Sequence, residues 1–187
     1  MGSTPDRVHH PVRIETERLV LDAHVADDFE SLAAMWADPD VVKHIGGRPA
    51  SAQESWMRLL RYRGLWPVLG YGYWAVRDKR NGRFAGDVGF ADFRREIEPP
   101  ITGVPEAGWV FAVWAQGHGF AGEALGAALA WLDSTVSIDC SVCLIAPDNK
   151  PSIRLAERNG FLEAKTVSFA GERTLLLSRR RRCTVAD

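Results

Sequence analysis

A cluster of glycines directly before a strongly helical segment limits what this chain can fold into. The stretch VWAQGHGFAGEALGAALAWL, residues 113–132, places Gly117, Gly119 and Gly122 ahead of an Ala/Leu-rich run with helical spacing. A helix start offers backbone N–H groups without partners and a partial positive charge, and phosphate binds there where the backbone can be approached closely. The residues alone leave two interpretations open: a tight strand-to-helix turn, or a cradle for a diphosphate.

Two other nucleotide-binding motifs are absent. The cluster has no Lys-Ser/Thr pair, as a Walker A loop would, and its glycines do not follow the G-x-G-x-x-G spacing. An ATP- or dinucleotide-binding enzyme is therefore disfavoured.

The segments around the cluster alternate between strand and helix patterns, which predicts a mixed α+β sheet with a central crossover helix. A Ser51–Glu54 capping box, an Asn149 cap and a Gly160 stop mark helix ends. The predicted helix 51–66 also carries an apolar stripe of Trp56, Leu59 and Leu60. The loop 94–106 holds three prolines and is expected on the surface. The predicted strands are 11–24, 70–78, 83–93, 105–114, 137–146, 161–169 and 173–178, and the predicted helices are 28–38, 38–45, 51–66, 119–135 and 148–160.

Composition narrows the class of protein. The 187 residues are 46% hydrophobic and 25% charged with a net charge of −1, which is typical of a globular protein and disfavours a nucleic-acid partner. No apolar run reaches the length of a membrane span, and the first residues have no apolar core, so we expect no membrane partner and a cytoplasmic location. The five histidines lack metal-ligand spacing, so no metal is expected.

Three cysteines, Cys140, Cys143 and Cys183, are expected to be reduced. The first two form a C-x-x-C, but inside a predicted strand, where residues three apart face opposite sides. We interpret them as ordinary strand or core cysteines.

Three signatures in order resemble the GNAT superfamily of acyl-CoA-dependent N-acyltransferases. Gln116-Gly117-His118-Gly119-Phe120-Ala121 is similar to its diphosphate motif Gln/Arg-x-x-Gly-x-Gly/Ala, EAGWVFAVW to its fourth strand, and DNKPSIRLAERNGF to its second signature. IETERLVL and ADPDVVKHI resemble the RimJ/RimL-type branch of protein N-terminal acetyltransferases. The resemblance covers about residues 12–178 and implies a single domain, 1–187, with flexible tails at 1–11 and 179–187.

The resemblance also implies a fold and a donor site. The fold is a mixed, mostly antiparallel sheet of about seven strands, flanked by helices and splayed between strands 4 and 5. The donor is acetyl-CoA, and its pantetheine would bond to backbone at Phe111 and Val113, with Asn149 near the pantetheine and Arg158 near the nucleotide phosphate. Each of these four has a plainer interpretation, as a strand residue, a helix cap or a solvated charge. The diphosphate would lie on the amides of Gln116, Gly117, His118, Gly119, Phe120, Ala121 and Gly122.

The reaction that the resemblance implies would use a general base and a general acid. Glu106, at the start of the fourth strand, matches a position that often carries the base; an exposed strand-end carboxylate is the alternative. Many members carry a Tyr acid four residues before the Gly of Gly-Phe, where this chain has Ala156. Ser152 is the nearest substitute hydroxyl in sequence, unless it simply faces solvent.

The sequence thus predicts an acetyl-CoA-dependent N-acetyltransferase that acts on a primary amine, either a protein N-terminus or a small molecule. The alternative is a degenerate module that holds acyl-CoA as a sensor or scaffold, and Ala156 motivates it. A homodimer is compatible with the resemblance. Six aromatic residues are candidates for an acceptor pocket or for the core: Trp36, Trp56, Trp66, Tyr71, Tyr73 and Trp74.

Overall fold

One mixed sheet organises the part of the chain that the structure, a computed structural model, describes: residues 10–181. Its eight strands follow the order β1-β2-β3-β4-β5-β6-β8-β7, and every neighbouring pair is antiparallel except β5 and β6. The strands are β1 (Ile14–Glu15), β2 (Leu19–Asp22), β3 (Tyr73–Asp78), β4 (Phe84–Ala91), β5 (Glu106–Phe111), β6 (Cys140–Ile145), β7 (Glu163–Phe169) and β8 (Glu172–Arg180).

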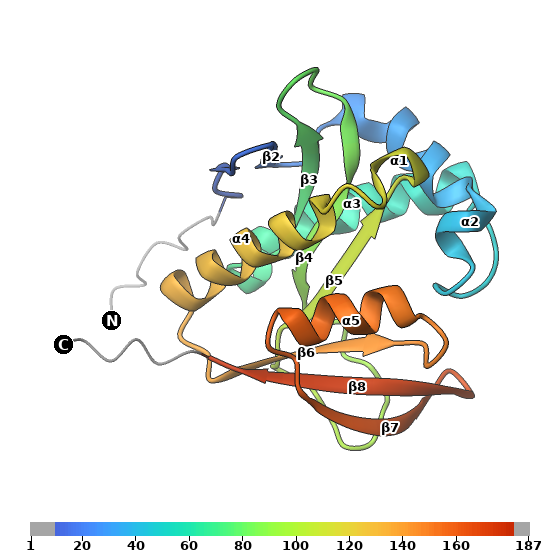
Figure 1. Cartoon of the computed structure of the whole chain (residues 1–187), viewed down its shortest axis with the longest axis vertical. Helices are drawn as coiled ribbons and strands as arrows, with labels where there is room; N and C mark the ends of the chain where they lie inside the picture. The colour runs from blue at the N-terminus through green and yellow to red at the C-terminus, as the bar shows by residue number, and fades with distance from the viewer. Residues whose placement is uncertain (1–9, 182–187) are drawn as a thin grey trace, which may run out of the picture.

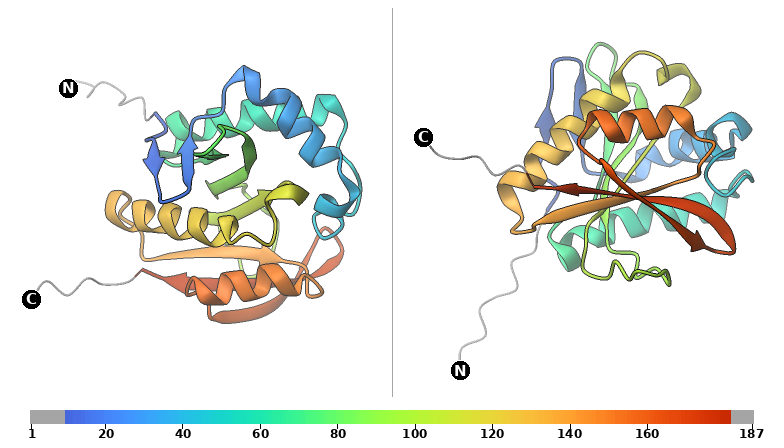
Figure 2. Two further views of the ribbon diagram at one scale, coloured as in Figure 1. Left: turned by 45° about the horizontal axis from the view of Figure 1, so that its top comes forward. Right: turned by 60° about the horizontal axis from the view of Figure 1, so that its bottom comes forward.

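Helices cover both faces of this sheet (Figures 1 and 2). Helices α4 and α5 lie on one face, and α4, which buries Leu125, Ala128 and Leu132, packs against β2, β4 and β5. Helices α1 and α3 lie on the other face, where Leu32 and Met35 form a separate core with Phe84. The helices are α1 (Phe29–Ala37), α2 (Pro39–Val42), α3 (Ala52–Leu69), α4 (Phe120–Thr135) and α5 (Lys150–Arg158), with 3-10 turns at Ala26–Asp28 and Val113–Ala115.

The mixed α+β fold, with a mostly antiparallel sheet that opens at one parallel pair, is confirmed. The sheet has one strand more than expected because the predicted strand 11–24 is a hairpin, β1 turning into β2. The hydrogen bond from the Thr16 amide to the Leu19 carbonyl, 3.0 Å long, closes its turn.

The capping predictions are confirmed, but the buried face of α3 differs from the predicted apolar stripe. Ser51 and Glu54 form the capping box of α3, and Asn149 caps α5 through the Ser152 amide. On α3, however, Trp56 and Leu60 are exposed, and of the three residues in the predicted apolar stripe Leu59 alone is buried. The inward face instead carries Ser55, Leu59, Tyr62 and Trp66.

The loop predicted to lie on the surface and the first residues of the predicted flexible tail are both partly buried. The proline-containing loop before β5 inserts Ile97 and Ile101 beside Val167, because the sheet beyond β6 leaves apolar surface that this loop covers. Strand β8 continues to Arg180, two residues past the predicted end of the domain core. Arg179 is buried and pairs with Asp133 at the end of α4.

The cysteines lie where the strand pattern predicts. Cys140 is half-buried and Cys143 is buried in β6, and both are free thiols. Burial, with the nearby Glu106 carboxylate, raises the pKa of the Cys143 thiol far above its ordinary value, so it is a poor nucleophile. Cys183 lies outside the described residues.

A carboxylate on α4 ties the N-terminal hairpin to the sheet. Glu123 accepts hydrogen bonds from the Thr16 hydroxyl, the Arg18 amide at 2.8 Å and the Arg18 Nε at 2.7 Å. Burial alone would raise the pKa of Glu123, but these hydrogen bonds together lower it below its ordinary value. The contact therefore stabilises the fold while Glu123 is ionised.

Glu123→Gln should lower the free energy of unfolding by about 1–2 kcal/mol, because charge-assisted hydrogen bonds are lost at a partly exposed site. The pKa of Glu123 is lower in the folded chain, so the difference from wild type is full at neutral pH and shrinks as the pH falls below about 4. Urea unfolding at both pH values measures it, with the exposed Glu157→Gln as control. Equal stability of the two variants at neutral pH would contradict this account.

Candidate active site

The parallel strands β5 and β6 part almost as soon as they meet. They share a single register pair, Glu106 opposite Val142, beside a 3.0 Å hydrogen bond from the Val142 amide to the Pro105 carbonyl. Beyond this point the two strands diverge, and α4 and α5 begin on the side of the molecule where they separate (Figure 1). The β6-facing edge of β5 is therefore open along the rest of the strand.

Strand β5 ends earlier than its sequence pattern predicts. It stops at Phe111, and Val113–Ala115 forms a 3-10 turn, so the predicted strand 105–114 is wrong over its last residues. The Gln116 side chain causes the turn to close: its Nε2 donates to the Phe111 carbonyl at 2.9 Å. The Phe111 side chain is buried and Val113 is half-exposed. Backbone contacts of pantetheine to these two residues stay predictions.

Backbone N–H groups without partners line the turn before α4. Gly117 and Gly119 have φ values of +76° and +78°, a left-handed conformation that favours glycine. Within the described residues, no intramolecular hydrogen bond uses the amides of residues 117–122. A Cβ at Gly117 would meet no atom within 4 Å, so the backbone is open there, whereas a Cβ at Gly119 would lie 3.3 Å from the Arg18 Nη2. The turn is a concave set of donors of the kind that binds anions.

One of the predicted amide donors already has a partner inside the turn. The Gln116 amide donates to the Val113 carbonyl at 3.1 Å, because the 3-10 turn uses it internally. The available amides therefore begin at Gly117. The Nδ1 of His118 already has a hydrogen-bond partner, since it lies 2.7 Å from the Gln116 carbonyl oxygen.

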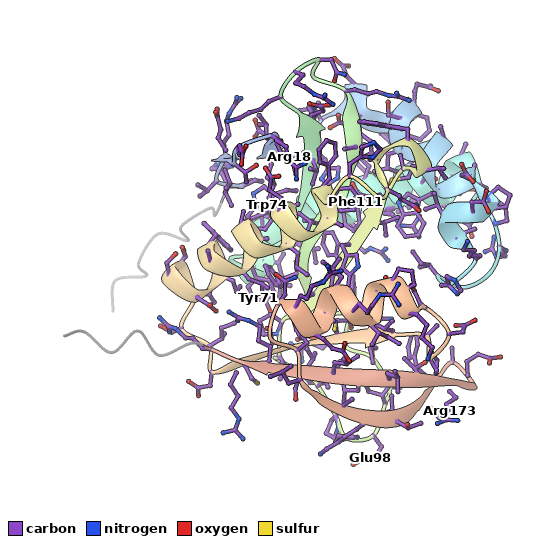
Figure 3. The ribbon with its side chains drawn as sticks, viewed as in Figure 1. Arg18, Tyr71, Trp74, Glu98, Phe111 and Arg173 are labelled. Atoms are coloured by element: carbon purple, nitrogen blue, oxygen red, sulfur yellow. The ribbon has the colours of Figure 1, made fainter. Side chains whose placement is uncertain are left out.

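Arg18, which the sequence did not single out, holds this turn in place. Its Nη1 donates to the His118 carbonyl at 2.8 Å, and its guanidinium carbon lies 5.1 Å from the Phe120 ring centroid. Figure 3 shows Arg18 and Phe111 near the start of α4. No sequence motif marks Arg18, because its partners lie a hundred residues away.

A cavity of about 500 Å³ lies where β5 and β6 part. It brings together three predicted site residues, Glu106, Asn149 and Ser152. Of the candidate aromatic residues, Trp36 and Tyr73 line it, whereas Trp66 and Trp74 belong to the core. Its other lining residues come from the segment after α2, from α3, from the loop before β5, from β5 and from β6 with the residue that follows it.

Glu106 is buried rather than exposed. Its two oxygens accept hydrogen bonds from Arg95, at 2.5 Å from Nε and 2.7 Å from Nη2. The Arg95 guanidinium carbon lies 4.8 Å from the Phe93 ring centroid and 4.5 Å from that of Phe169. A bidentate ion pair between aromatic rings fixes the direction of the Glu106 carboxylate. The exposed-carboxylate interpretation of Glu106 is therefore wrong.

Tyr73 reaches the same cavity from β3. A Cβ at position 108 would lie only 2.0 Å from the Tyr73 hydroxyl oxygen, so this hydroxyl fits against β5 only because residue 108 is glycine. Its ring stacks on Tyr62 with centroids 4.3 Å apart. Burial, then the Glu106 charge, raises the pKa of Tyr73 well above its ordinary value, so its hydroxyl stays protonated.

The start of α5 presents the last two predicted residues. The Asn149 Oδ1 accepts a hydrogen bond from the Ser152 amide at 3.2 Å, and both side chains line the cavity. Ala156 is fully buried in the core, so no side chain from that position enters the site. Arg158 is exposed in the last turn of α5, where its Nε donates to the Arg154 carbonyl, and it does not line the cavity.

Residues 10–181 contain no group of three or more His, Cys, Asp or Glu side chains placed to hold a metal ion. Over the same residues, no helix has the length and apolar character needed to cross a membrane.

Comparison with known proteins gives these features a context. The sequence model of the Acetyltransferase (GNAT) domain family matches residues 18–162. The uncharacterized protein YkkB of Bacillus subtilis strain 168 is 31% identical over 159 residues, which cover 83% of this chain and 88% of YkkB.

Solved structures share the whole architecture. A putative GnaT-family acetyltransferase from Bordetella pertussis is 36% identical, with a TM-score of 0.79 over 90% of this chain and 99% of that one. RimL, a ribosomal L7/L12 alpha-N-protein acetyltransferase solved in complex with coenzyme A, has a TM-score of 0.71 at 18% identity, over 90% of this chain and 98% of its own.

If the amides of residues 117–122 bind a diphosphate, a negative charge beside them should weaken binding. His118→Glu should raise the Kd for coenzyme A about fivefold, since repulsion near a surface amounts to about 1 kcal/mol. His118→Ala retains the backbone amide and should bind as wild type does. Calorimetry at low salt measures both, and added salt should shrink the difference. Equal loss in the two variants would mean that the ring, not the backbone, binds.

Proposed function

We propose that this chain, which belongs to the GNAT acetyltransferase family, transfers an acetyl group from acetyl-CoA to a primary amine. The observation that carries the proposal is the continuity of the site. A run of free amides at residues 117–122 leads, along the open edge of β5, to a cavity lined by Glu106 and Ser152.

The donor fits the groups that the chain leaves unpaired. Six consecutive amides, from Gly117 to Gly122, and the positive end of α4 suit a diphosphate. The open edge of β5 suits the amide groups of pantetheine, which need backbone partners. RimL, which has a similar fold, was solved in complex with coenzyme A, and this supports acetyl-CoA as the donor.

The chemistry needs two proton movements. The neutral amine attacks the thioester carbonyl carbon, the C–S bond breaks, the amine nitrogen loses a proton, and the thiolate gains one. We assign the proton acceptor to Glu106, directly or through a water: Arg95 fixes its carboxylate, and each oxygen retains a further lone pair. We assign the donor to the Ser152 hydroxyl, which lines the cavity at the first turn of α5.

The alternative, a degenerate acyl-CoA sensor, is favoured by one observation: Ala156 carries no hydroxyl and is buried in the core. A thiolate is a tolerable leaving group, so this absence need not abolish turnover. Turnover separates the two functions, because the sensor binds acetyl-CoA and transfers nothing.

Purified protein with acetyl-CoA and a panel of primary amines should release free thiol. Glu106→Gln should lower kcat about a hundredfold, which is typical of losing a general base, while the Kd for coenzyme A stays unchanged. Glu157→Gln, on the exposed face of α5, is the matched control, and a thermal melt of each variant verifies folding.

Tight acetyl-CoA binding without turnover on any amine would establish the sensor instead. A Glu106→Gln variant with wild-type kcat would remove Glu106 as the base.

A further inference from the structure

The cavity where β5 and β6 part carries an excess of positive charge. Three arginines line it, Arg58, Arg61 and Arg95, but Glu106 is the one carboxylate among its lining residues. Arg95 and Glu106 form an ion pair and cancel. Within residues 10–181, neither Arg58 nor Arg61 has a carboxylate within ion-pair distance. Two positive charges on α3 therefore face the cavity without counter-ions.

Arg58 is held in a fixed position. Its guanidinium carbon lies 3.5 Å from the Trp36 ring centroid. The Trp36 Nε1 donates to one oxygen of the buried Asp87 at 3.3 Å, and the His24 Nε2 lies 2.8 Å from the other. Asp87 itself does not line the cavity, so it orients Trp36, and Trp36 in turn supports Arg58.

One nitrogen of Arg58 lacks an acceptor. Its Nη1 is buried, and among the described residues it has no hydrogen-bond partner. A buried donor without an acceptor is costly, and native structures rarely retain one unless water, an ion or a ligand satisfies it. Burial also lowers the pKa of Arg58 below its ordinary value, as expected for a cation that lacks an adjacent counter-ion.

Arg61 extends the same charged face by one helical turn. It is exposed, and its guanidinium carbon lies 5.3 Å from the Phe93 ring centroid, at the edge of the cavity. A second hollow of about 580 Å³ adjoins on α3 and is also lined by Arg58 and Arg61. There Arg48 and Glu54 pair with each other, so they leave the excess charge unchanged. Arg58 and Arg61 thus stand between two hollows that a ligand could enter.

We propose that the amine acceptor carries a carboxylate or similar anionic group that binds Arg58 and Arg61 while its amine reaches Glu106. This inference rests on the proposed acetyl transfer and names the acceptor class of that site. The stacked rings of Tyr62 and Tyr73 lie in the same lining and suit an apolar part between the two polar ends. A polyamine, which has no anionic group, is repelled by the same two arginines.

Matched pairs of acceptors, with and without an anionic group, test the proposal. Acetyl transfer is measured for L-phenylalanine against L-phenylalaninamide, for β-alanine, for short peptides with an acidic second residue, and for spermidine. Carboxylated acceptors should have the higher kcat/KM, although the amide's amine is the weaker base and is more often unprotonated. Comparing the free amino acids with the peptides shows whether the carboxylate belongs to a small molecule or to a protein N-terminus.

Variants then locate the contact. Arg58→Gln and Arg61→Gln should each raise KM for the preferred carboxylated amine about tenfold to a hundredfold, because a charge-assisted hydrogen bond is lost. The KM for acetyl-CoA and the rate with uncharged amines should stay unchanged. Arg58→Lys should retain part of the preference. Arg63→Gln, on the same helix but outside both hollows, is the matched control.

The possible failures are distinguishable. Acetylation of spermidine and neutral amines as fast as carboxylated ones, with Arg61→Gln unchanged, would overturn the acceptor class and leave the acetyltransferase intact. No acetylation of any amine, with acetyl-CoA still bound, would overturn both.

Discussion

The separation of β5 from β6 is the constraint on which the rest of this site depends. A continuous sheet would pair every backbone group of β5, and only the single pair at Glu106 and Val142 keeps these two strands together. Once they part, β5 has an open edge, and the helices α4 and α5 begin beside the opening. A cavity of about 500 Å³ lies where the two strands separate. Donor and acceptor can then approach one another from two sides.

Arginines perform different tasks at the two ends of this opening. Arg18 anchors the turn before α4 through a carbonyl oxygen, which leaves the N–H groups of that turn facing outward. Arg95 fixes the Glu106 carboxylate. Arg58, which packs on Trp36, has a buried nitrogen without a hydrogen-bond partner among the described residues. In our account the first two arginines build the transfer machinery, and the third selects what enters it.

Features that depend on residues close together in the sequence were predicted correctly. The Ser51–Glu54 box, the Asn149 cap and the glycine turn each depend on residues within a few positions, and their structure follows from backbone requirements. The order of strands and helices followed from periodicity, apart from the hairpin at the N-terminus and the early end of β5. The family signatures supplied the splayed sheet, which no local pattern reveals.

Contacts between distant segments could not be predicted. Arg18 meets the turn before α4 from a hundred residues away, and Arg95 meets Glu106 from a loop expected to lie on the surface. The exposure of Trp56 and Leu60 depends on how α3 rotates against the sheet, which hydrophobicity alone did not decide. Tyr73 reaches β5 only because residue 108 is a glycine, a fit that appears once β3, β4 and β5 are assembled.

The most direct test of the central claim follows the amide resonances of residues 117–122 in a ¹⁵N-labelled sample. Pantetheine is the thiol-bearing part of coenzyme A, and it lacks the diphosphate. Our account predicts that coenzyme A shifts the Gly117, Gly119 and Gly122 amides, whereas pantetheine leaves them unchanged and shifts amides of β5 and of the start of α5. The distant turn glycine Gly171 serves as reference. Saturating coenzyme A that leaves the three amides unmoved, or shifts that pantetheine reproduces, would contradict the diphosphate cradle.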